Sequence, residues 1–460
     1  MADNKSSIKV GFLLYSKSQI NTFLKSSSLK ELGEKIDLTL VKVHSELNVS
    51  NEYFPGEILE LPRLNKIIIK FSGLIQLLSL WKYRSRSMNH TVRAMASFGN
   101  KKQRIDWNCV VVSEMNIHLI KRLAVRFFSM SPMYFVSRRL ENFLRKLFIY
   151  SKWNKTLSNF DLLIIPFSGH VAMEFGSLVW FAKKTSKISF AVQENWDNLS
   201  TKTFILEEPD YFAVWGEQSA GHVRSIHRMF KTNICVVGSA RFGPYYKKET
   251  NNQKPEVSNY DGRQIILENP YILIGGTGDG EDDELLIAAS FNAVTHYRGQ
   301  TAPIVVYRPH PFTRTPRNHE ILSKKYPGLL VDSGPLAAEF GHHNKLVSNC
   351  EVLINHFSTL SLEGLIANVF VCVPLFLGRS SAQYRYNHIL NEWHHMMGLG
   401  LIKELLTPRN ENELIKAIEF TLFNEIHKTS INVNWICQNI NWASAMIANI
   451  SKIHTTHAIL

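Results

Sequence analysis

The sequence has 460 residues, of which 45% are hydrophobic and 20% are charged, and its formal net charge at pH 7 is +13. This composition excludes a disordered or fibrous chain and is typical of a globular protein. The length exceeds the roughly 250 to 300 residues at which a single core stops growing, so we expect two domains. The basic charge indicates an anionic partner: a nucleotide, a phospholipid surface or a nucleic acid.

Cysteine usage and the first residues indicate the compartment. The five cysteines show no paired spacing, which is typical of core thiols in a reducing cytosol. The first ten residues lack the apolar core of a signal peptide. The longest apolar stretch, Ile67 to Trp81, is interrupted by Lys70 and is shorter than the roughly 20 residues that a membrane span needs. The sequence therefore predicts a cytoplasmic protein.

The first half of the chain alternates short apolar runs with segments of helix length. The predicted strands are Val10–Tyr15, Leu38–Val43, Cys109–Val112, Leu162–Ile165, Ile188–Val192, Tyr211–Val214 and Ile234–Val237. Strands with helix-length spacing favour a mainly parallel sheet with crossover helices. We therefore predict an N-terminal Rossmann-like domain over residues 1–246.

The second half repeats this pattern after a polar stretch, Lys247–Gln264, that is typical of a linker. Its predicted strands are Tyr271–Ile274, Ile304–Val306, Leu329–Val331, Val352–Ile354 and Val369–Val373. They indicate a second Rossmann-like domain over residues 265–430. Apolar residues between Asn432 and Ile453 predict a closing helix within 431–460 that crosses back to the first domain.

Two polar motifs directly follow strands of the second half, where ligands bind in an open α/β sheet. In the first, Arg308 and His310 point to the same side of an extended segment that flanking prolines hold open. In the second, Ser358 and Thr359 open a helix, and Glu363 follows one turn later. The four donor side chains suit a phosphate and the carboxylate of Glu363 suits a ribose diol, while plain helix capping is the alternative for Ser358 and Thr359.

A glycine-rich turn, Gly276-Thr277-Gly278, stands between a predicted strand and a helix. Such a turn lets backbone amides approach a phosphate, although the spacing matches neither the dinucleotide fingerprint nor the P-loop, and a plain tight turn explains it equally well. The acidic run that follows, from Asp279 to Glu284, fits either a metal-bound diphosphate or carboxylates in the first turn of a helix. We favour the helix and predict no metal site.

A polar loop follows the predicted strand Ile188–Val192 and contains Glu194, Trp196 and Asp197. Either carboxylate could take the proton of an acceptor hydroxyl as a general base, or could only accept hydrogen bonds that close the loop. His170 follows another predicted strand and is a third candidate for the base.

Basic residues gather between Lys82 and Lys146, with aromatic residues among them. The basic residues are Lys82, Arg84, Arg86, Arg93, Lys101, Lys102, Arg104, Lys121, Arg122, Arg126, Arg138, Arg139, Arg145 and Lys146. The aromatic residues are Trp81, Phe127, Phe128, Tyr134, Phe135 and Phe143. This mixture favours contact with an anionic membrane surface, and a solvated basic face is the alternative.

Five runs together carry a family resemblance: QENWDNLSTK, PDYFAVWGEQSAGH, ICVVGSARFGPY, VVYRPHP and INHFSTLSLEGLIANVFVCVP. In their order they resemble bacterial surface-carbohydrate (O-antigen or capsule) glycosyltransferases of GT-B architecture, of the type named for its WDN motif. More distantly they are similar to CMP-sugar-using Kdo and sialic-acid transferases and to glycerophosphotransferases of teichoic-acid synthesis. The resemblance covers most of the chain from about Leu162 to Leu405.

The resemblance implies an α/β protein whose two Rossmann-like domains face a cleft, with the acceptor on the first and a nucleotide-sugar donor on the second. It implies that His310, Ser358 and Thr359 contact the donor phosphates, that Arg308 supports them, and that Glu363 holds the ribose. The acceptor would be a surface polysaccharide or a lipid-linked glycan precursor. Independently of the resemblance, the sequence features described above predict a cytoplasmic protein that uses no metal or other cofactor, and the basic region favours peripheral attachment at the inner face of the membrane.

Two alternatives stay within the same fold: a nucleotide-sugar 2-epimerase and a CDP-glycerol-type glycerophosphotransferase. A third, of another class, is a basic non-enzymatic protein that binds lipid or nucleic acid. The absence of any helix-turn-helix, finger or aromatic RNA-binding signature in the sequence argues against nucleic acid.

Overall fold

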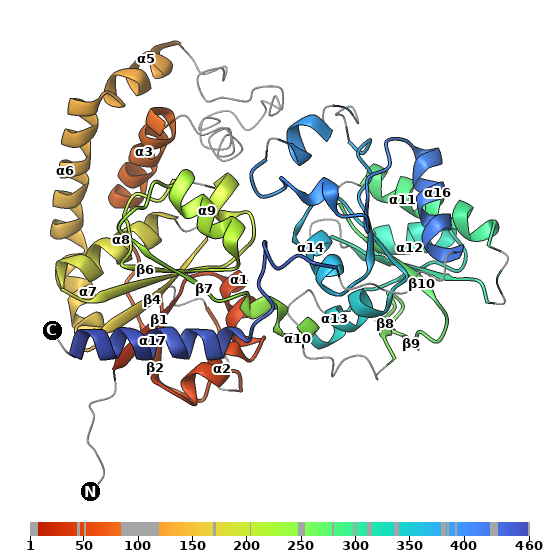
Figure 1. Ribbon diagram of the computed structural model, residues 1–460, viewed down its shortest axis with the longest axis horizontal. Helices are drawn as coiled ribbons and strands as arrows, with labels where there is room; N and C mark the ends of the chain where they lie inside the picture. The colour runs from red at the N-terminus through yellow and green to blue at the C-terminus, as the bar shows by residue number, and fades with distance from the viewer. Residues whose placement is uncertain are drawn as a thin grey trace, which may run out of the picture. The chain divides into compact units, whose positions relative to one another are not determined.

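The computed structural model describes residues 8–43, 47–49, 52–83, 119–168, 172–202, 204–246, 254–277, 280–297, 299, 301–310, 315–334, 340–378, 383, 386–391, 393–423 and 431–458. The chain forms two compact units (Figure 1). The first comprises Met1–Ala240, Trp393–His395 and Trp435–Leu460. The second comprises Arg241–Glu392 and Met396–Asn434.

The first unit is built on a seven-stranded sheet in the order β3-β2-β1-β4-β5-β6-β7, and all its pairs are parallel. Its strands are β1 (Lys9–Leu14), β2 (Asp37–Lys42), β3 (Ile58–Glu60), β4 (Leu162–Phe167), β5 (Ile188–Gln193), β6 (Tyr211–Val214) and β7 (Asn233–Val236). All six residues of β4 are buried, because helices cover both faces of a parallel sheet. The apolar runs in the sequence are therefore continuous rather than alternating.

Most helices of the first unit pack on the two faces of this sheet (Figure 1). The helices of this unit are α1 (Lys17–Gln19), η1 (Ile20–Leu24), α2 (Ser28–Gly33), α3 (Lys66–Tyr83), α5 (Leu119–Phe128), α6 (Ser131–Phe148), α7 (Tyr150–Leu157), α8 (Ala172–Lys184), η4 (Asn198–Lys202), α9 (Glu217–Ser225) and α17 (Trp442–Ala458). Helices α5 and α6 pack instead against α3. One core contains Trp153, Phe175 and Phe181, and the other contains Phe12 and Phe23.

The last helix, α17, belongs to the first unit, and its Trp442, Met446 and Ile450 join the core beside α2. The chain that leads to it passes close to Gly238, whose φ is +69°. A Cβ at Gly238 would lie 2.7 Å from the carbonyl oxygen of Gln438. Glycine is therefore required there both for the backbone conformation and for the close approach of the returning chain.

The second unit is built on a six-stranded parallel sheet in the order β12-β11-β10-β13-β14-β15. Its strands are β10 (Tyr271–Gly275), β11 (Ile304–Arg308), β12 (Leu330–Val331), β13 (Val352–Ile354), β14 (Phe370–Cys372) and β15 (Leu405–Leu406). Its other elements are η5 (Ala240–Phe242, at the boundary of the units), α10 (Gly243–Tyr246), α11 (Gly280–Thr295), α12 (Pro316–Lys325), α13 (Phe340–Asn349), α14 (Thr359–Ile366), η7 (Tyr386–Leu390), η8 (Leu399–Leu401) and α16 (Glu411–Phe423).

The predicted fold class, α/β with two Rossmann-like sheets, is confirmed. Eleven of the twelve predicted strands overlap observed ones, and the twelfth, Cys109–Val112, lies outside the described residues. The prediction missed the short strands β3 and β15. It was wrong about part of the linker, where β8 (Glu256–Ser258) and β9 (Gln264–Ile266) form an antiparallel hairpin. The hairpin joins the second unit through a bridge from Asn259 to Asp332.

Both sheets reverse their strand order at one place, between β1 and β4 in the first and between β10 and β13 in the second. In open α/β sheets a ligand binds outside the carboxyl ends of the strands at such a reversal. The topology therefore marks one candidate edge in each unit.

Within the described part of the chain, no helix combines the length and the apolar character needed to cross a membrane.

Candidate functional site

At the reversal in the second sheet, the chain leaving β10 lies directly against the chain leaving β11. The amide of Gly276 donates to the carbonyl oxygen of Arg308 at 2.9 Å. A Cβ at Gly276 would lie 2.4 Å from the backbone nitrogen of His310, a distance that no side chain tolerates. Gly276 is therefore required by close approach of the His310 segment, and this packing fixes where His310 leaves the sheet.

The amides of Gly276 and Thr277 in the glycine-rich turn are engaged within the protein, which fits the plain tight turn that the sequence left open beside a phosphate cradle. The amide and hydroxyl of Thr277 both donate to Oδ1 of Asp283, at 2.6 and 2.7 Å. The Tyr307 hydroxyl donates to the other oxygen of this buried carboxylate at 2.6 Å. One residue of the acidic run thus closes the turn, and Gly278 lies outside the described residues.

The guanidinium of Arg308 faces inward rather than toward a ligand. It is 8% exposed and forms an ion pair with Asp332, which is fully buried. Burial alone would raise the pKa of Asp332, but a hydrogen bond from His342 and the charge of Arg308 outweigh burial and hold it below its usual value. Any support that Arg308 gives to a bound phosphate is indirect, because it ties β11 to the segment after β12. His310, two residues on, is half-buried.

Ser358 and Thr359 stand at the N-terminus of α14, which follows β13. The Ser358 hydroxyl accepts from the amide of Leu360 at 3.2 Å and from the side-chain amide of Asn355 at 3.1 Å. Ser361 completes a capping box by accepting from the Ser358 backbone. The sequence prediction missed this box because serine replaces the usual glutamate. Ser358 is exposed and Thr359 is half-buried, so this helix end reaches the surface.

Glu363 lies one turn further along α14 and is 1% exposed, so it is not presented to solvent as a ribose ligand would be. Its carboxylate pairs with Arg241 at 2.5 Å, accepts from the Tyr245 hydroxyl at 2.9 Å, and contacts Nε2 of His343 at 2.6 Å. Burial would raise the pKa of Glu363, but the charge of Arg241, followed by His343, lowers it to about 2. In this structure Glu363 holds a cation in place.

This edge therefore gathers positive potential. The half-buried His310 follows β11, and the N-terminus of α14 follows β13. The partly exposed Arg241 is held by Glu363 of α14. Helix N-termini and guanidinium groups are the usual ligands of phosphate. Sequence reasoning missed Arg241, although the residue stands in the run ICVVGSARFGPY that carries part of the resemblance. No spacing in the sequence links it to Glu363, 122 positions later.

The WDN loop after β5 is largely tied to its own unit. The indole of Trp196 is buried and donates to Oε1 of Gln218 at 3.0 Å. Asn198 donates to the Phe167 carbonyl at 2.8 Å. Asp197 accepts through its backbone carbonyl from the amides of Ser200 and Thr201. The motif mainly builds the loop, and Asp197 organises the turn that follows it.

Glu194 lies instead at the reversal of the first sheet, between the ends of β1 and β4. It is 4% exposed and accepts a hydrogen bond from Ser18, and its amide donates to the Phe167 carbonyl. Tyr15, the residue after β1, is also buried, and burial together with the charges of Glu194 and Glu174 raises the pKa of its hydroxyl well above the usual value. Burial likewise raises the pKa of Glu174 in the first turn of α8.

The structure thus brings Glu194 together with three residues that sequence reasoning missed, Tyr15, Gln19 and Glu174. In the described part of the chain, the Tyr15 hydroxyl and Nε2 of Gln19 are buried without a hydrogen-bond partner. Unsatisfied buried donors are costly, and each calls for a physical reason such as a catalytic role or a bound water or ion. No sequence signal marks these residues, and His170 lies outside the described residues.

A three-residue segment, Trp393–His395, belongs to the first unit although its neighbours in the chain belong to the second. Nδ1 of His395 lies 2.8 Å from the Ser200 hydroxyl, and its ring packs edge-on against Trp196. Burial, with His395 and His394 close by, lowers the pKa of His222 to about 3. The buried ring of His222 is therefore a neutral packing group, and no cluster of three or more His, Cys, Asp or Glu among the described residues is arranged to hold a metal ion.

Comparison with solved structures shows the same fold in proteins of very different sequence. S. aureus MnaA in complex with UDP superposes with a TM-score of 0.54 at 13% identity, covering 98% of this chain and 97% of that one. UDP-GlcNAc 2-epimerase from Methanocaldococcus jannaschii gives 0.51 at 12% identity, covering 97% and 100%. No family model and no curated protein matches the sequence. The fold is thus GT-B-like, as predicted.

Proposed function

We propose that the protein is a glycosyltransferase that moves a sugar from a nucleotide-sugar donor to a surface polysaccharide or a lipid-linked glycan precursor. The observation that carries the proposal is the gathering of His310, the N-terminus of α14 and Arg241 at the strand-order reversal of the second sheet. A nucleoside diphosphate fits such an edge because it is a compact anion. The resemblance of the WDN and RPHP runs supports transfer as the reaction.

On the donor side, the bond between the anomeric carbon and the nucleotide phosphate breaks, and negative charge develops on the leaving phosphate. His310, Arg241 and the amides that open α14 stabilise that charge, and such electrostatic stabilisation usually contributes most to catalysis. Glu363 acts through Arg241 by holding its guanidinium at 2.5 Å. Ser358 and Thr359 shape the helix end that receives the phosphate.

On the acceptor side, the hydroxyl oxygen bonds to the anomeric carbon and loses its proton to a base. Glu194 is the best-supported base, because it is buried at the reversal of the first sheet beside Tyr15 and Glu174. A desolvated carboxylate is a stronger base than an exposed one. Asp197 is the weaker candidate, since it organises the loop.

A nucleotide-binding experiment with a matched histidine control tests the donor site. Among UDP, GDP, CMP, CDP and TDP, at least one should raise the melting temperature, because a ligand that binds the folded state stabilises it. His310→Ala should lose most of that shift, whereas His296→Ala, at an exposed histidine paired with Glu419, should keep it. No shift with any nucleotide would contradict the proposed function, and an undiminished shift in His310→Ala would remove the role of His310.

A second candidate, a nucleotide-sugar 2-epimerase, is favoured by the fold comparison, since the M. jannaschii structure is an enzyme of that activity. Incubation with UDP-GlcNAc and other nucleotide-sugars without any acceptor separates the two. An epimerase changes the sugar under these conditions, whereas a transferase leaves it intact until an acceptor is added. A CDP-glycerol-type glycerophosphotransferase would instead consume CDP-glycerol.

A further inference from the structure

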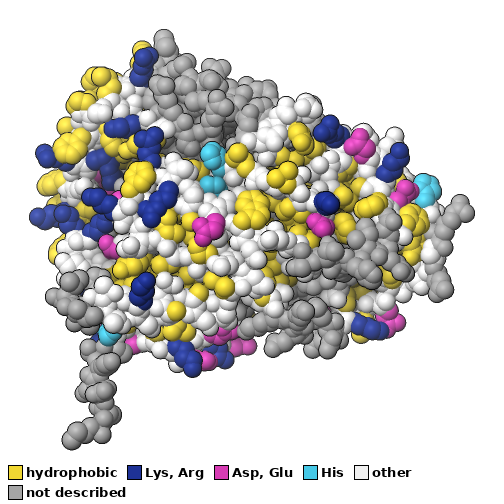
Figure 2. Space-filling view, viewed as in Figure 1, with side chains coloured by type: hydrophobic (Ala, Val, Ile, Leu, Met, Phe, Trp, Pro, Cys, Tyr) yellow, Lys and Arg dark blue, Asp and Glu magenta, His cyan; other side chains and the backbone are white. Residues whose placement is uncertain are grey.

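The outer face of α5 and α6 exposes large apolar side chains over about five turns of helix. Phe127, Met130, Phe135, Leu140, Phe143 and Leu147 lie on it, with exposed fractions from 46% for Leu140 to 61% for Phe143 and Leu147. The exposed positions of α6 recur at three and four residues, so they form one stripe. Figure 2 shows hydrophobic and basic side chains side by side over this part of the molecule.

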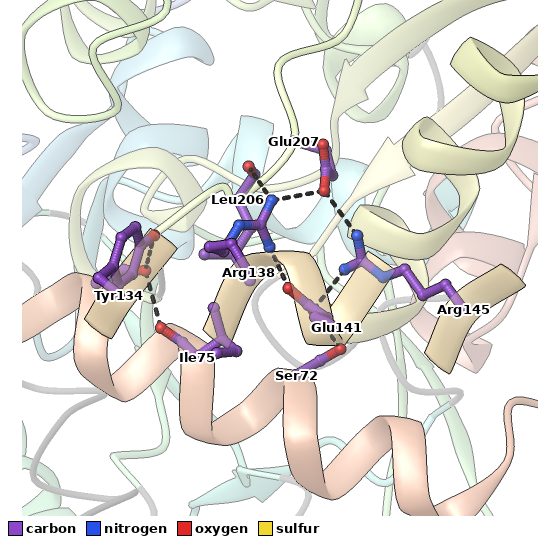
Figure 3. A network of polar contacts seen from close by, with 9 residues as sticks. Ser72, Ile75, Tyr134, Arg138, Glu141, Arg145, Leu206 and Glu207 are labelled. Carbon is purple, nitrogen blue, oxygen red and sulfur yellow. Dashed lines mark hydrogen bonds and ion pairs between the residues drawn. The ribbon is translucent and has the colours of Figure 1, made fainter. Parts of the chain in front are cut away.

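The inner face of the same helix is ionic, which is the reverse of a usual surface helix. Glu141 and Arg145 are 1% and 0% exposed and pair with each other at 2.7 Å (Figure 3). Glu207 binds the guanidinium groups of Arg138 and Arg145, each at 2.6 Å, and Ser72 of α3 donates to Glu141 at 2.6 Å. The network fixes the rotation of α6 about its axis. Because this network holds the ionic face of α6 inward, the apolar stripe on the opposite face points outward.

The charge of this region has one sign at its surface. Residues 119–157 contain nine Lys and Arg against a single acidic residue, Glu141, and that carboxylate is buried in the network. Arg126, Arg139 and Lys146 are exposed among the apolar side chains. The guanidinium of Arg139 lies 4.5 Å from the ring centroid of Phe135. The face therefore offers apolar and cationic groups together and no exposed anion of its own helices.

We propose that the outer face of α5 and α6 is a docking surface for an anionic lipid bilayer. An interfacial helix buries an apolar stripe at the level of the lipid headgroups while basic side chains bind anionic lipid. A second copy of the chain is a poor occupant, because a symmetric contact of this face would bring like charges together. The inference extends beyond the proposed function and does not depend on it, since it names where the protein attaches.

Vesicle co-sedimentation of the full chain without nucleotide tests the proposal. The protein should sediment with vesicles of phosphatidylcholine and phosphatidylglycerol, more weakly with phosphatidylcholine alone, and less as salt rises. The triple variant Arg126→Gln, Arg139→Gln, Lys146→Gln should bind anionic vesicles about a hundredfold more weakly, at about fivefold per basic residue. Phe135→Ser, Phe143→Ser, Leu147→Ser should bind at least about tenfold more weakly.

Two control variants carry the same number and kind of substitutions at exposed positions outside α5 and α6. Lys30→Gln, Lys35→Gln, Lys416→Gln removes three exposed charges away from this face, and Ile266→Ser, Ile321→Ser, Leu401→Ser removes three exposed apolar side chains of the second unit. Both controls should bind like the unchanged protein. Light scattering after size-exclusion chromatography gives the oligomeric state of every variant.

Several outcomes would overturn the proposal. Failure of the unchanged protein to bind anionic vesicles at low salt would do so, as would equal binding by the face variants and the controls. A dimer that the Phe135→Ser, Phe143→Ser, Leu147→Ser variant converts to a monomer would assign the face to a second copy instead.

Discussion

The two sheet edges share one topology but differ in charge and burial. In each sheet the strand order reverses between the first and fourth strands of that sheet. The second edge carries the guanidinium of Arg241 and a helix N-terminus, and the carboxylate of Glu363 that pairs with Arg241 is buried. The first edge buries two carboxylates, Glu194 and Glu174, around the Tyr15 hydroxyl. The same backbone plan thus carries a basic edge in one unit and an edge with buried carboxylates in the other, because side chains rather than topology decide the chemistry of a site.

The largest expected effect tests the first edge. Glu194→Gln keeps the size of the side chain and an acceptor for Ser18 but removes the base, so turnover should fall by about 10² to 10⁴. Asp197→Asn is the matched control and should retain most of the activity. Steady-state kinetics with donor and acceptor, together with far-UV circular dichroism, would measure this. Full turnover by Glu194→Gln would show that the base lies elsewhere.

The next effect tests the second edge through stability. Glu363→Ala leaves Arg241 and His343 without their buried partner, so the free energy of unfolding should fall by about 3 to 5 kcal/mol. Glu320→Ala, which breaks an exposed pair with Lys324 in the same unit, should change it little. Urea denaturation of the two variants, with unfolding of the second unit monitored by hydrogen exchange, would compare their free energies of unfolding. Equal losses in both variants would mean that Glu363 is not the anchor described above.

The smallest expected effect is a loss of folding stability at acid pH that arises from His222. The pKa of His222 is about 3 in the folded protein against about 6.5 in an unfolded chain. The unfolded state therefore binds the proton first as pH falls below 6.5, and stability decreases. From pH 7 to 5 this one residue should cost up to about 2 kcal/mol.

His222→Gln should remove that part of the pH dependence, as measured by urea denaturation at pH 7, 6 and 5. Glu363 should contribute nothing over this interval, because its depressed pKa matters only below the unfolded value of about 4.5. The same pH slope in His222→Gln and in the unchanged protein would contradict the buried neutral state of this ring.

The sequence predicted the secondary-structure elements better than it predicted the contacts between residues far apart in the chain. The apolar runs at Leu162–Phe167 and Ile188–Gln193 predicted strands because burial on both faces of a parallel sheet leaves an unbroken signal. Two-residue strands such as Leu405–Leu406 leave no such signal. His310 and Ser358 could be placed at one edge of the sheet from the sequence, because each lies within four residues of the end of a strand.

The partners of these residues were not predictable in the same way. Arg308 and Glu363 were expected to face a ligand, but their charges are met by Asp332 and by Arg241. The sequence contains all four residues without any sign of which pairs form, because buried ions must be paired and the pairing depends on packing.

The sequence by itself determined the element types, the two-domain α/β plan and the positions of polar residues at strand ends, because periodicity and chain order are local properties. Only the tertiary structure decided which side chains meet. Tertiary packing places Tyr15, Gln19 and Glu174 beside Glu194. The apolar stripe of α6 faces outward because Glu141 and Arg145 on the other side of the helix are buried. Those outcomes depend on contacts between residues far apart in the chain, where burial and charge pairing outweigh local preference.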